Sequence, residues 1–372
     1  MVRAVFLKSM HAKRVLSLAS GAVGTMHAAN LGVSAIGRAL AQAQGLESKH
    51  AIKQVDRLLS NEGIDVWKAF ASWVPFVVGS RDEVVVALDW TDYDQDGHTT
   101  LAIHMVTTHG RATPLMWKTV RKSRLKGRRN AHEDRLLVHL RSVVPMGVKV
   151  TVLADRGFGD ASLYGLHWEL GLDHVIRFRG DVMVTDASGE SRPAKEWLLP
   201  SGRARILRDV TVTGQKKPVA AVVCVWAKGM KEPWFLACGA GSRDCTAAQL
   251  VKLYGRRFTI EESFRDTKDI RYGMGLSMTR IKSPARRDRL LLLSALSTAL
   301  LTLLGAAGEA LGHDRMLRAN TVKRRTHSLL FQGTYYYGAL PAMEPTKRRR
   351  LMAEFGRLLC DLPVFKHVFG VL

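Results

Sequence analysis

Two continuous apolar runs, each ending in an aspartate, constrain the fold of this chain more than any other feature. The runs are EVVVALD, which ends at Asp89, and VKVTVLAD, which ends at Asp155. Runs of this kind are typical of central strands that are buried on both faces of a sheet. We therefore expect both aspartates at the carboxyl ends of such strands.

The segments around these runs predict the order of the other elements. Asp96-Gly97 indicates a hairpin, so TTLAIHMVTT and ATPLMWKTV are expected to be the second and third strands. A helix follows, then the strand that ends at Asp155, a second helix at about 160–170, and the strand HVIRFR. Three antiparallel strands followed by helix, strand, helix and strand describe an α/β unit of the ribonuclease-H type. In that topology the first and fourth strands are parallel neighbours, which brings Asp89 and Asp155 together.

A third candidate carboxylate lies in the segment YGRRFTIEESFRDTK, expected to be part of a helix from about 246 to 269. With about 100° per residue, Tyr254, Arg257, Glu261 and Lys268 fall at roughly 0°, 300°, 340° and 320° around that helix. One arc thus carries a phenol, two cations and a carboxylate, which suits a site for a metal ion and a phosphodiester. The alternative is a surface helix with ordinary ion pairs between residues four apart.

Three carboxylates around one point repel one another unless a cation or a proton compensates them. Oxygen-only ligands favour Mg²⁺, with Mn²⁺ able to substitute, over zinc. We expect Asp89, Asp155 and Glu261 to be both catalytic residues and metal ligands in a two-metal phosphoryl transfer, with Arg257 and Lys268 offsetting phosphate charge. The acidic cluster DYDQDG lacks a glutamate at the twelfth position of a calcium loop and predicts a hairpin turn, although Asp92 or Asp94 could replace Asp89 as a ligand.

The charge of the chain indicates a polyanionic partner. Lys+Arg 56 against Asp+Glu 33 gives a formal net charge of +23, spread along the whole chain. Nucleic acid is the first expectation, and an anionic membrane surface is the second. The loop KTVRKSRLKGRRN is expected to contact DNA through six cations, namely Arg121, Lys122, Arg124, Lys126, Arg128 and Arg129.

Other compositional features favour a cytoplasmic protein that does not span a membrane. The 4 cysteines lack metal-binding spacing, and the N-terminus lacks the pattern of a signal peptide. The run LLLLSALSTALLTLL has 15 residues, fewer than the roughly 18–20 needed to cross a bilayer. We expect it to be a buried core helix.

The chain divides into five predicted regions. Residues 1–78 are a helical region that could bind DNA or cap the next domain, and 79–180 are the first part of the catalytic core. Residues 181–245 form a β-rich insertion with three strand-like runs, 246–285 contain the catalytic helix that closes the core, and 286–372 are a helical C-terminal region. The fold class is therefore α/β, a ribonuclease-H-like core interrupted by a β-rich insertion and flanked by helical regions.

From about residue 81 to 268, the chain resembles the bacterial insertion-sequence transposases that carry a DDE triad and a Y-R-E-K signature. Asp89 precedes WT, Asp155 lies in ADRGFGD, and the four Y-R-E-K positions match Tyr254, Arg257, Glu261 and Lys268. The resemblance implies that Tyr254, Arg257 and Lys268 bind DNA. It also implies that Trp234, in the insertion, stacks on a flipped base while a DNA hairpin forms. The neighbouring Trp226 is expected to be a packed strand residue.

The resemblance further implies metal-dependent cleavage at terminal inverted repeats and strand transfer into target DNA, by a homodimer in the synaptic complex. It places the protein in the bacterial cytoplasm at the nucleoid. The alternatives are a ribonuclease-H-like nuclease without strand transfer, or a non-catalytic DNA-binding relic or inhibitor of transposition. Intact Asp89, Asp155 and Glu261 argue against the relic.

Overall fold

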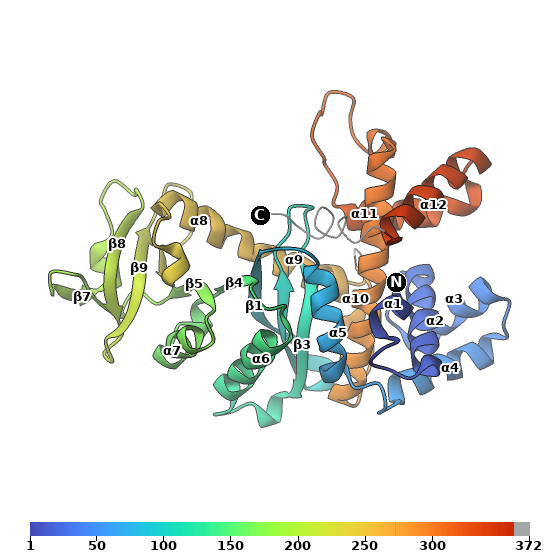
Figure 1. Ribbon diagram of the computed structural model, residues 1–372, viewed down its shortest axis with the longest axis horizontal. Coiled ribbons are helices and arrows are strands. Elements are labelled where there is room, and N and C mark those ends of the chain that lie inside the picture. Colours follow the sequence, from blue (N-terminus) through green and yellow to red (C-terminus); the bar gives the residue numbers. More distant parts are fainter. Residues whose placement is uncertain (272, 361–372) are drawn as a thin grey trace.

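The computed structural model describes residues 1–271 and 273–360. Five helices open the chain: α1 (Val2–Phe6), α2 (Ala12–Ala28), α3 (Val33–Gln44), α4 (Ser48–Ser60) and α5 (Val66–Val78). The first four lie at one end of an elongated molecule, α5 lies nearer its centre, and the strands of the insertion lie at the other end (Figure 1). The helical character of this region, predicted from the apolar spacing in α4, is confirmed.

The core sheet begins with three antiparallel strands followed by two parallel ones. These are β1 (Glu83–Tyr93), β2 (His98–Met105), β3 (Thr113–Arg121), β4 (Lys149–Ala154) and β5 (Asp173–Phe178). β1 pairs antiparallel with β2 and parallel with β4, and β4 pairs parallel with β5. The predicted topology is confirmed. One detail is wrong: β1 does not end at Asp89 but continues to Tyr93, because residues 90–93 keep pairing with β2.

The insertion extends this sheet instead of forming a separate one. Its strands are β6 (Met183–Thr185), β7 (Ser191–Pro193), β8 (Arg205–Val212), β9 (Lys217–Val225) and β10 (Trp234–Cys238). β10 pairs antiparallel with β5, which gives one ten-stranded sheet in the order β3-β2-β1-β4-β5-β10-β9-β8-β6-β7. The three predicted runs correspond to β8, β9 and β10, and the short hairpin β6–β7 was not predicted.

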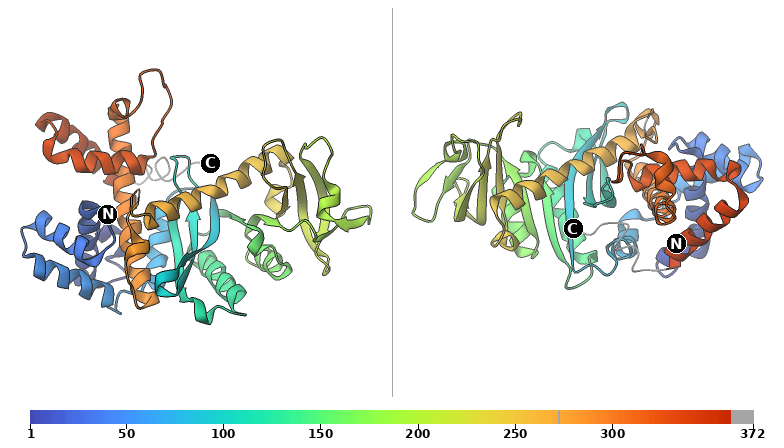
Figure 2. Two further views of the ribbon diagram at one scale, coloured as in Figure 1. Left: turned by 180° about the vertical axis from the view of Figure 1, so that it is seen from behind. Right: turned by 90° about the horizontal axis from the view of Figure 1, so that it is seen from above.

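Helices cover both faces of the sheet. On one face, α6 (Arg129–Val143) and α7 (Ala161–Glu169) pack in the same core as Val86 and Leu88 of β1. On the other face, α8 (Ala247–Gly255) and α9 (Thr259–Lys268) pack with Val85 and Ala87. Alternate residues of β1 therefore face opposite cores, as the pleat of a strand requires. Figure 2 shows α8 and α9 running along the sheet from the insertion toward β1.

The long helix α10 (Pro284–Ala310) lies between the sheet and the N-terminal helices, packed against β3 on one side and α2 on the other (Figures 1 and 2). It has 27 residues and so extends beyond the 15-residue apolar run on which the prediction of a core helix was based. By length and composition alone it could cross a membrane, which is weak evidence, since the core helix of a soluble protein passes the same test. Of its most apolar window, 78% is buried inside the protein, as expected of a core helix.

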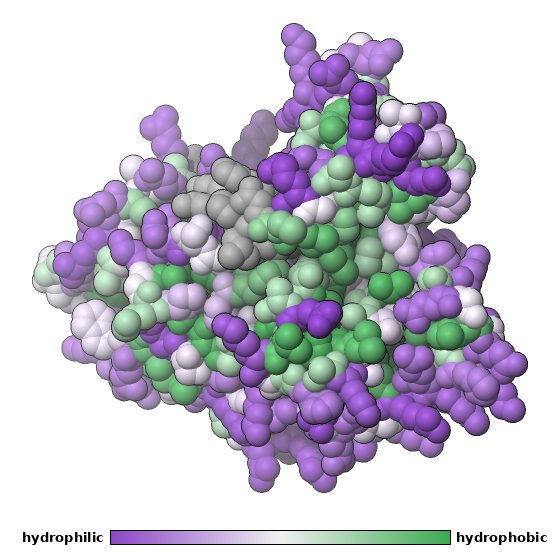
Figure 3. All heavy atoms as spheres, turned by 45° about the vertical axis from the view of Figure 1, so that its right-hand side comes forward, coloured by the Kyte–Doolittle hydropathy of each residue, from purple (hydrophilic) through white to green (hydrophobic). Residues whose placement is uncertain are grey.

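Two further helices, α11 (Leu329–Ala339) and α12 (Pro345–Cys360), complete the described chain. α10 and α11 approach closely because Gly333 has no side chain, and a methyl group there would collide with the carbonyl oxygen of Leu301. Residues 361–372 of the predicted C-terminal region lie outside the described residues. On the face shown in Figure 3, hydrophilic residues surround a more apolar central zone.

Candidate active site

The register of β1 and β4 sets the distance between the two candidate aspartates. Leu88 pairs with Ala154, so Asp89 and Asp155 are the next residues on two parallel neighbouring strands. Each carboxylate also accepts a backbone hydrogen bond, Asp89 from Trp90 N at 2.8 Å and Asp155 from Gly157 N at 2.8 Å. The structure thus brings these two predicted residues together at one edge of the sheet.

The helix that carries Glu261 crosses the same edge. It begins at a capping box, in which the Thr246 hydroxyl and the Gln249 side chain satisfy each other's backbone N–H groups, and Asp269 follows its last residue. These ends confirm the predicted span. The helix is not continuous, because Arg256–Phe258 form a 3-10 turn between α8 and α9. Glu261 consequently lies in the first turn of α9.

Arg257 joins the first and third carboxylates of the candidate triad. Its Nη1 donates to Asp89 Oδ2 at 3.2 Å, and its Nη2 donates to Glu261 Oε1 at 2.6 Å. The Arg257 side chain is 7% exposed and that of Asp89 is 17% exposed, whereas Glu261 is 49% exposed. The guanidinium therefore compensates one mostly buried carboxylate, Asp89, and one half-exposed carboxylate, Glu261.

The electrostatics of Asp89 reflect this crowding. The pKa of Asp89 is raised to about 6, chiefly by burial. The positive charge of Arg257 acts to lower it, and the negative charges of Asp155 and Glu261 act to raise it. A carboxyl group in this state gains from a nearby cation, because the cation favours its ionised form.

The other two residues of the Y-R-E-K arc also lie against the sheet. Lys268 Nζ donates to Thr91 Oγ1 at 3.2 Å and to the Asp92 carbonyl oxygen at 2.8 Å, both on β1. Tyr254 is 2% exposed and lies beside Arg257. In this arrangement Lys268 fixes the end of α9 to β1, and the Tyr254 ring forms part of the wall behind Arg257.

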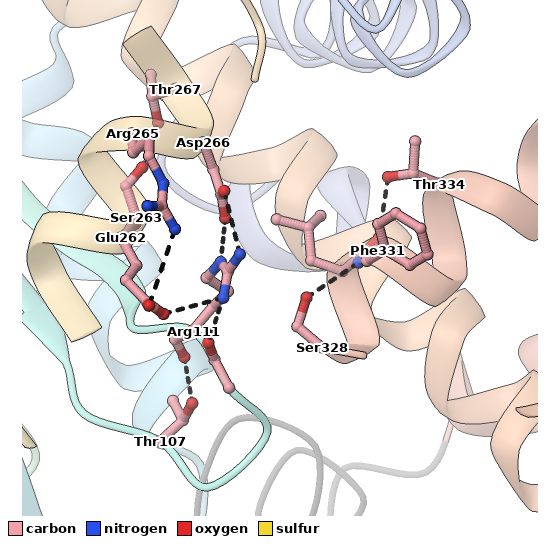
Figure 4. Close-up of polar contacts among 12 residues, drawn as sticks. Thr107, Arg111, Glu262, Ser263, Arg265, Asp266, Thr267, Ser328, Phe331 and Thr334 are labelled. Carbon is pink, nitrogen blue, oxygen red and sulfur yellow. Dashed lines mark hydrogen bonds and ion pairs between the residues drawn. The ribbon is translucent and has the colours of Figure 1, made fainter. Parts of the chain in front are cut away.

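Arg111, in the turn before β3, is a residue that sequence reasoning missed. It donates from Nη1 to Glu262 Oε2 at 3.0 Å and from Nε to Asp266 Oδ2, both on α9 (Figure 4). Together with Lys268 and Arg257, it makes α9 a helix held to the core sheet by three cations. No local sequence signal identifies Arg111, because its partners lie more than 150 residues further along the chain.

Trp234 and Trp226, the two tryptophans of the insertion considered above, lie in different environments. Trp234 is partly buried, and its ring packs edge-on against Tyr254 with centroids 5.0 Å apart, next to the helix of the candidate site. Trp226 is 54% exposed, and its indole N–H bonds the Met230 carbonyl oxygen. The expectation that Trp226 is a packed strand residue is wrong, because it follows the last residue of β9.

The acidic turn between β1 and β2 is occupied by internal ion pairs. Lys122 Nζ contacts Asp92 Oδ2 at 2.8 Å and Asp94 Oδ1 at 2.5 Å. Asp96 pairs with the fully buried Arg287 of α10. These carboxylates fix the turn to the basic loop and to α10, and the turn itself confirms the predicted hairpin.

The structure divides the six cations of the basic loop into engaged and exposed groups. Lys122 is engaged as described, and Arg129 pairs with Glu133 at 3.4 Å while its guanidinium lies over the Trp90 ring. Arg121 donates to the Lys282 carbonyl oxygen at 3.2 Å. Arg124, Lys126 and Arg128 are exposed.

The donor chemistry of the site fits a hard divalent cation, since Asp89, Asp155 and Glu261 offer only carboxylate oxygens. Within residues 1–271 and 273–360, however, no three histidine, cysteine, aspartate or glutamate side chains converge as a ready-made metal site. The reason is local: Arg257 lies between Asp89 and Glu261. A bound ion at this place requires the guanidinium or the carboxylates to move.

This fold and site define a class: a ribonuclease-H-like core in which Asp89 and Asp155 lie on neighbouring parallel segments and Arg257 joins Asp89 to Glu261 on a crossing helix. Residues 80–300 match the family model described as "Transposase DDE domain". The chain belongs to this family and is a transposase of the DDE class, which implies DNA as its substrate. A comparison with curated proteins found no match.

Proposed function

We propose that this transposase cleaves DNA at terminal inverted repeats and joins the freed ends to target DNA. Asp89, Asp155 and Glu261 are the proposed catalytic residues and metal ligands. The observation that carries the proposal is the register of β1 and β4, which sets Asp89 beside Asp155, together with the Arg257 bridge from Asp89 to Glu261.

Each residue of the site has a proposed role. When bound by the three carboxylates, Mg²⁺ or Mn²⁺ would supply Lewis-acid activation of the attacking oxygen and neutralise phosphate charge. Arg257 would turn from the carboxylates to a phosphate oxygen of the cleaved strand, since a guanidinium binds both groups in the same geometry. Lys268 and Tyr254 would hold α9 and Arg257 at the position where the phosphate enters.

The finer steps belong to the same proposal. First-strand hydrolysis is followed by attack of the freed 3′-OH on the opposite strand, which gives a hairpin, and Trp234 stacks on the flipped base during that step. The position of Trp234, with its ring packed against that of Tyr254 in the candidate site, supports this role. We also propose that a homodimer holds the two ends in the synaptic complex and that the protein acts at the bacterial nucleoid in the cytoplasm, as the family resemblance implies.

The test is to incubate the protein with the flanking DNA of its own element and Mg²⁺, and to separate nicked, hairpin and joined products. The variants Asp89→Asn, Asp155→Asn and Glu261→Gln keep side-chain shape and should abolish cleavage while end binding survives. Glu83→Gln is the matched control, because Glu83 is exposed and lies on the same strand as Asp89. Cleavage by any one of the three variants would remove that residue from the triad.

The products also separate the alternatives. Cleavage without joining would identify a nuclease without strand transfer. Binding to the element ends without any Mg²⁺-dependent product would identify a DNA-binding relic.

A further inference from the structure

A pocket of about 600 Å³ lies where the end of β3, the basic loop and the first residues of α6 and α10 meet. Four arginines line it, together with one histidine and the first residue of α10: Arg121, Arg124, Arg128, Arg135, His132 and Pro284. Within the described part of the chain, no carboxylate lines this pocket. We call it the arginine pocket.

The guanidinium groups of the arginine pocket are available to a ligand. Within residues 1–271 and 273–360, Arg124 and Arg128 form no side-chain hydrogen bond or ion pair, and both are exposed. Arg135 lies over the Trp67 ring, 5.3 Å from its centroid, and it forms no side-chain hydrogen bond or ion pair with another described residue. Only Arg121 donates to the backbone, at Lys282.

The start of α6 adds to the positive potential. This helix has 15 residues, no acidic residue in its first turn and no side chain that caps its first N–H groups. Its unpaired amides therefore carry the positive end of the helix dipole toward the pocket. The helix dipole adds to the positive potential of the arginines, and without the arginines it would not be sufficient to form a binding site.

The arginine pocket is not the site of the cleaved phosphodiester. Asp89 lies on the face of the sheet that α9 covers, where Arg257 binds it. The next residue, Trp90, points to the opposite face, where its indole N–H donates to Glu133 of α6 at 2.7 Å. The pocket is lined by this same helix, so a ligand in it lies on the other side of the sheet from the triad.

We propose that the arginine pocket binds a phosphodiester group of double-stranded DNA outside the position that is cleaved. A guanidinium fork matches two phosphate oxygens, and several forks around one concave site select a phosphate over a less charged ligand. The duplex would then contact the protein on both sides of the active-site edge. This inference rests on the proposed function, since it names a second contact for the same DNA.

The experiment measures DNA affinity of the full chain as a function of salt. Each phosphate contact contributes about 0.9 to the slope of log K against log salt. The double variant Arg124→Ala/Arg128→Ala should therefore lower the slope by about 1 to 2. Arg124→Lys/Arg128→Lys should restore the slope, because it restores the charges.

The matched control is Arg141→Ala/Lys149→Ala, which removes two charges from the last turn of α6 and the first residue of β4, at the opposite end of the sheet. It should keep the wild-type slope. An unchanged slope in the Arg124/Arg128 variant, or an equal loss in the control, would overturn the arginine pocket as a DNA contact.

Two further measurements separate other outcomes. Wild-type cleavage with Mg²⁺ reports the proposed function independently, so its absence would count against the proposed cleavage and joining at the element ends, whatever the slopes show. Vesicles containing an anionic phospholipid serve as the competing phosphate source. If the Arg124/Arg128 variant lost vesicle binding and kept the DNA slope, the pocket would be a lipid site and the proposal would be wrong.

Discussion

Replacing Arg257 with alanine tests the electrostatic account of the candidate site. The change removes the guanidinium that contacts Asp89 at 3.2 Å and Glu261 at 2.6 Å. Removing one partner of a buried ion pair costs about 3–5 kcal/mol, because the other charge stays buried without compensation. Since Glu261 is half exposed and is stabilised by water, we expect a loss near the lower end, about 3 kcal/mol. For a chain of this size that corresponds to a fall of about 4 °C in the thermal midpoint.

The assay is thermal unfolding followed by circular dichroism, at pH 7.5 with EDTA. The control is Arg265→Ala, because Arg265 pairs with Glu262 on the same helix at 3.8 Å with both side chains exposed, and exposed pairs contribute roughly 0.2–1 kcal/mol. Addition of Mg²⁺ should recover part of the loss in the Arg257 variant, since a divalent cation compensates the same carboxylates.

The stability loss caused by Arg257→Ala should depend on pH with a defined sign. The folded pKa of Asp89 is raised to about 6, so Asp89 takes up a proton in the folded state as the pH falls through 6. A protonated Asp89 is neutral, so no buried negative charge is left for Arg257 to compensate. The difference in stability between wild type and Arg257→Ala should therefore be largest above pH 7 and shrink toward pH 5. A loss no larger than that of Arg265→Ala, or one that does not shrink in acid, would refute the reasoning.

Three further results are expected. The logarithm of the DNA-binding constant, measured by fluorescence anisotropy, should fall linearly with the logarithm of salt concentration. A flat dependence would point to a membrane surface as the partner instead. Trp234→Ala should slow hairpin formation about 5- to 150-fold, because stacking is worth roughly 1–3 kcal/mol, while nicking on end-labelled DNA stays nearly intact. Replacement of the exposed Trp226 with alanine is the control. Equal loss of nicked and hairpin products in the Trp234 variant would show that Trp234 has a structural role. His167 and His174 are buried with ring centroids 5.1 Å apart, and burial lowers the pKa of His174 to about 4 and that of His167 well below its usual value. Both histidines stay neutral in the folded state, while the unfolded chain takes up protons below its pKa. The free energy of unfolding should therefore be constant above about pH 6.5 and fall in acid by about 1.4 kcal/mol per pH unit for each histidine. A urea midpoint that is constant from pH 7 to 5 would contradict this.

The strands, the helix of the Y-R-E-K segment and their order could be predicted from the sequence because each depends on local pattern. A strand buried on both faces needs an uninterrupted apolar run, and β1 and β4 have one each. The capping box at Thr246 is likewise a signal within four residues. The right-handed crossover rule then set β1 beside β4, which is why Asp89 and Asp155 could be paired without a structure.

The sequence by itself thus determined the elements, their topology and the charges that a DNA substrate requires. Only the tertiary structure decided which charges those elements bring into contact. Arg257 bridges residues on β1 and α9, and Arg111 binds α9 from more than 150 residues away; both contacts depend on the angle at which a helix crosses a sheet, which no local spacing encodes. The same holds for the exposure of Trp226 and for the four arginines that meet at one pocket. Local propensity selects helix or strand within a few residues, whereas burial and ion pairing depend on which surfaces meet when the whole chain packs.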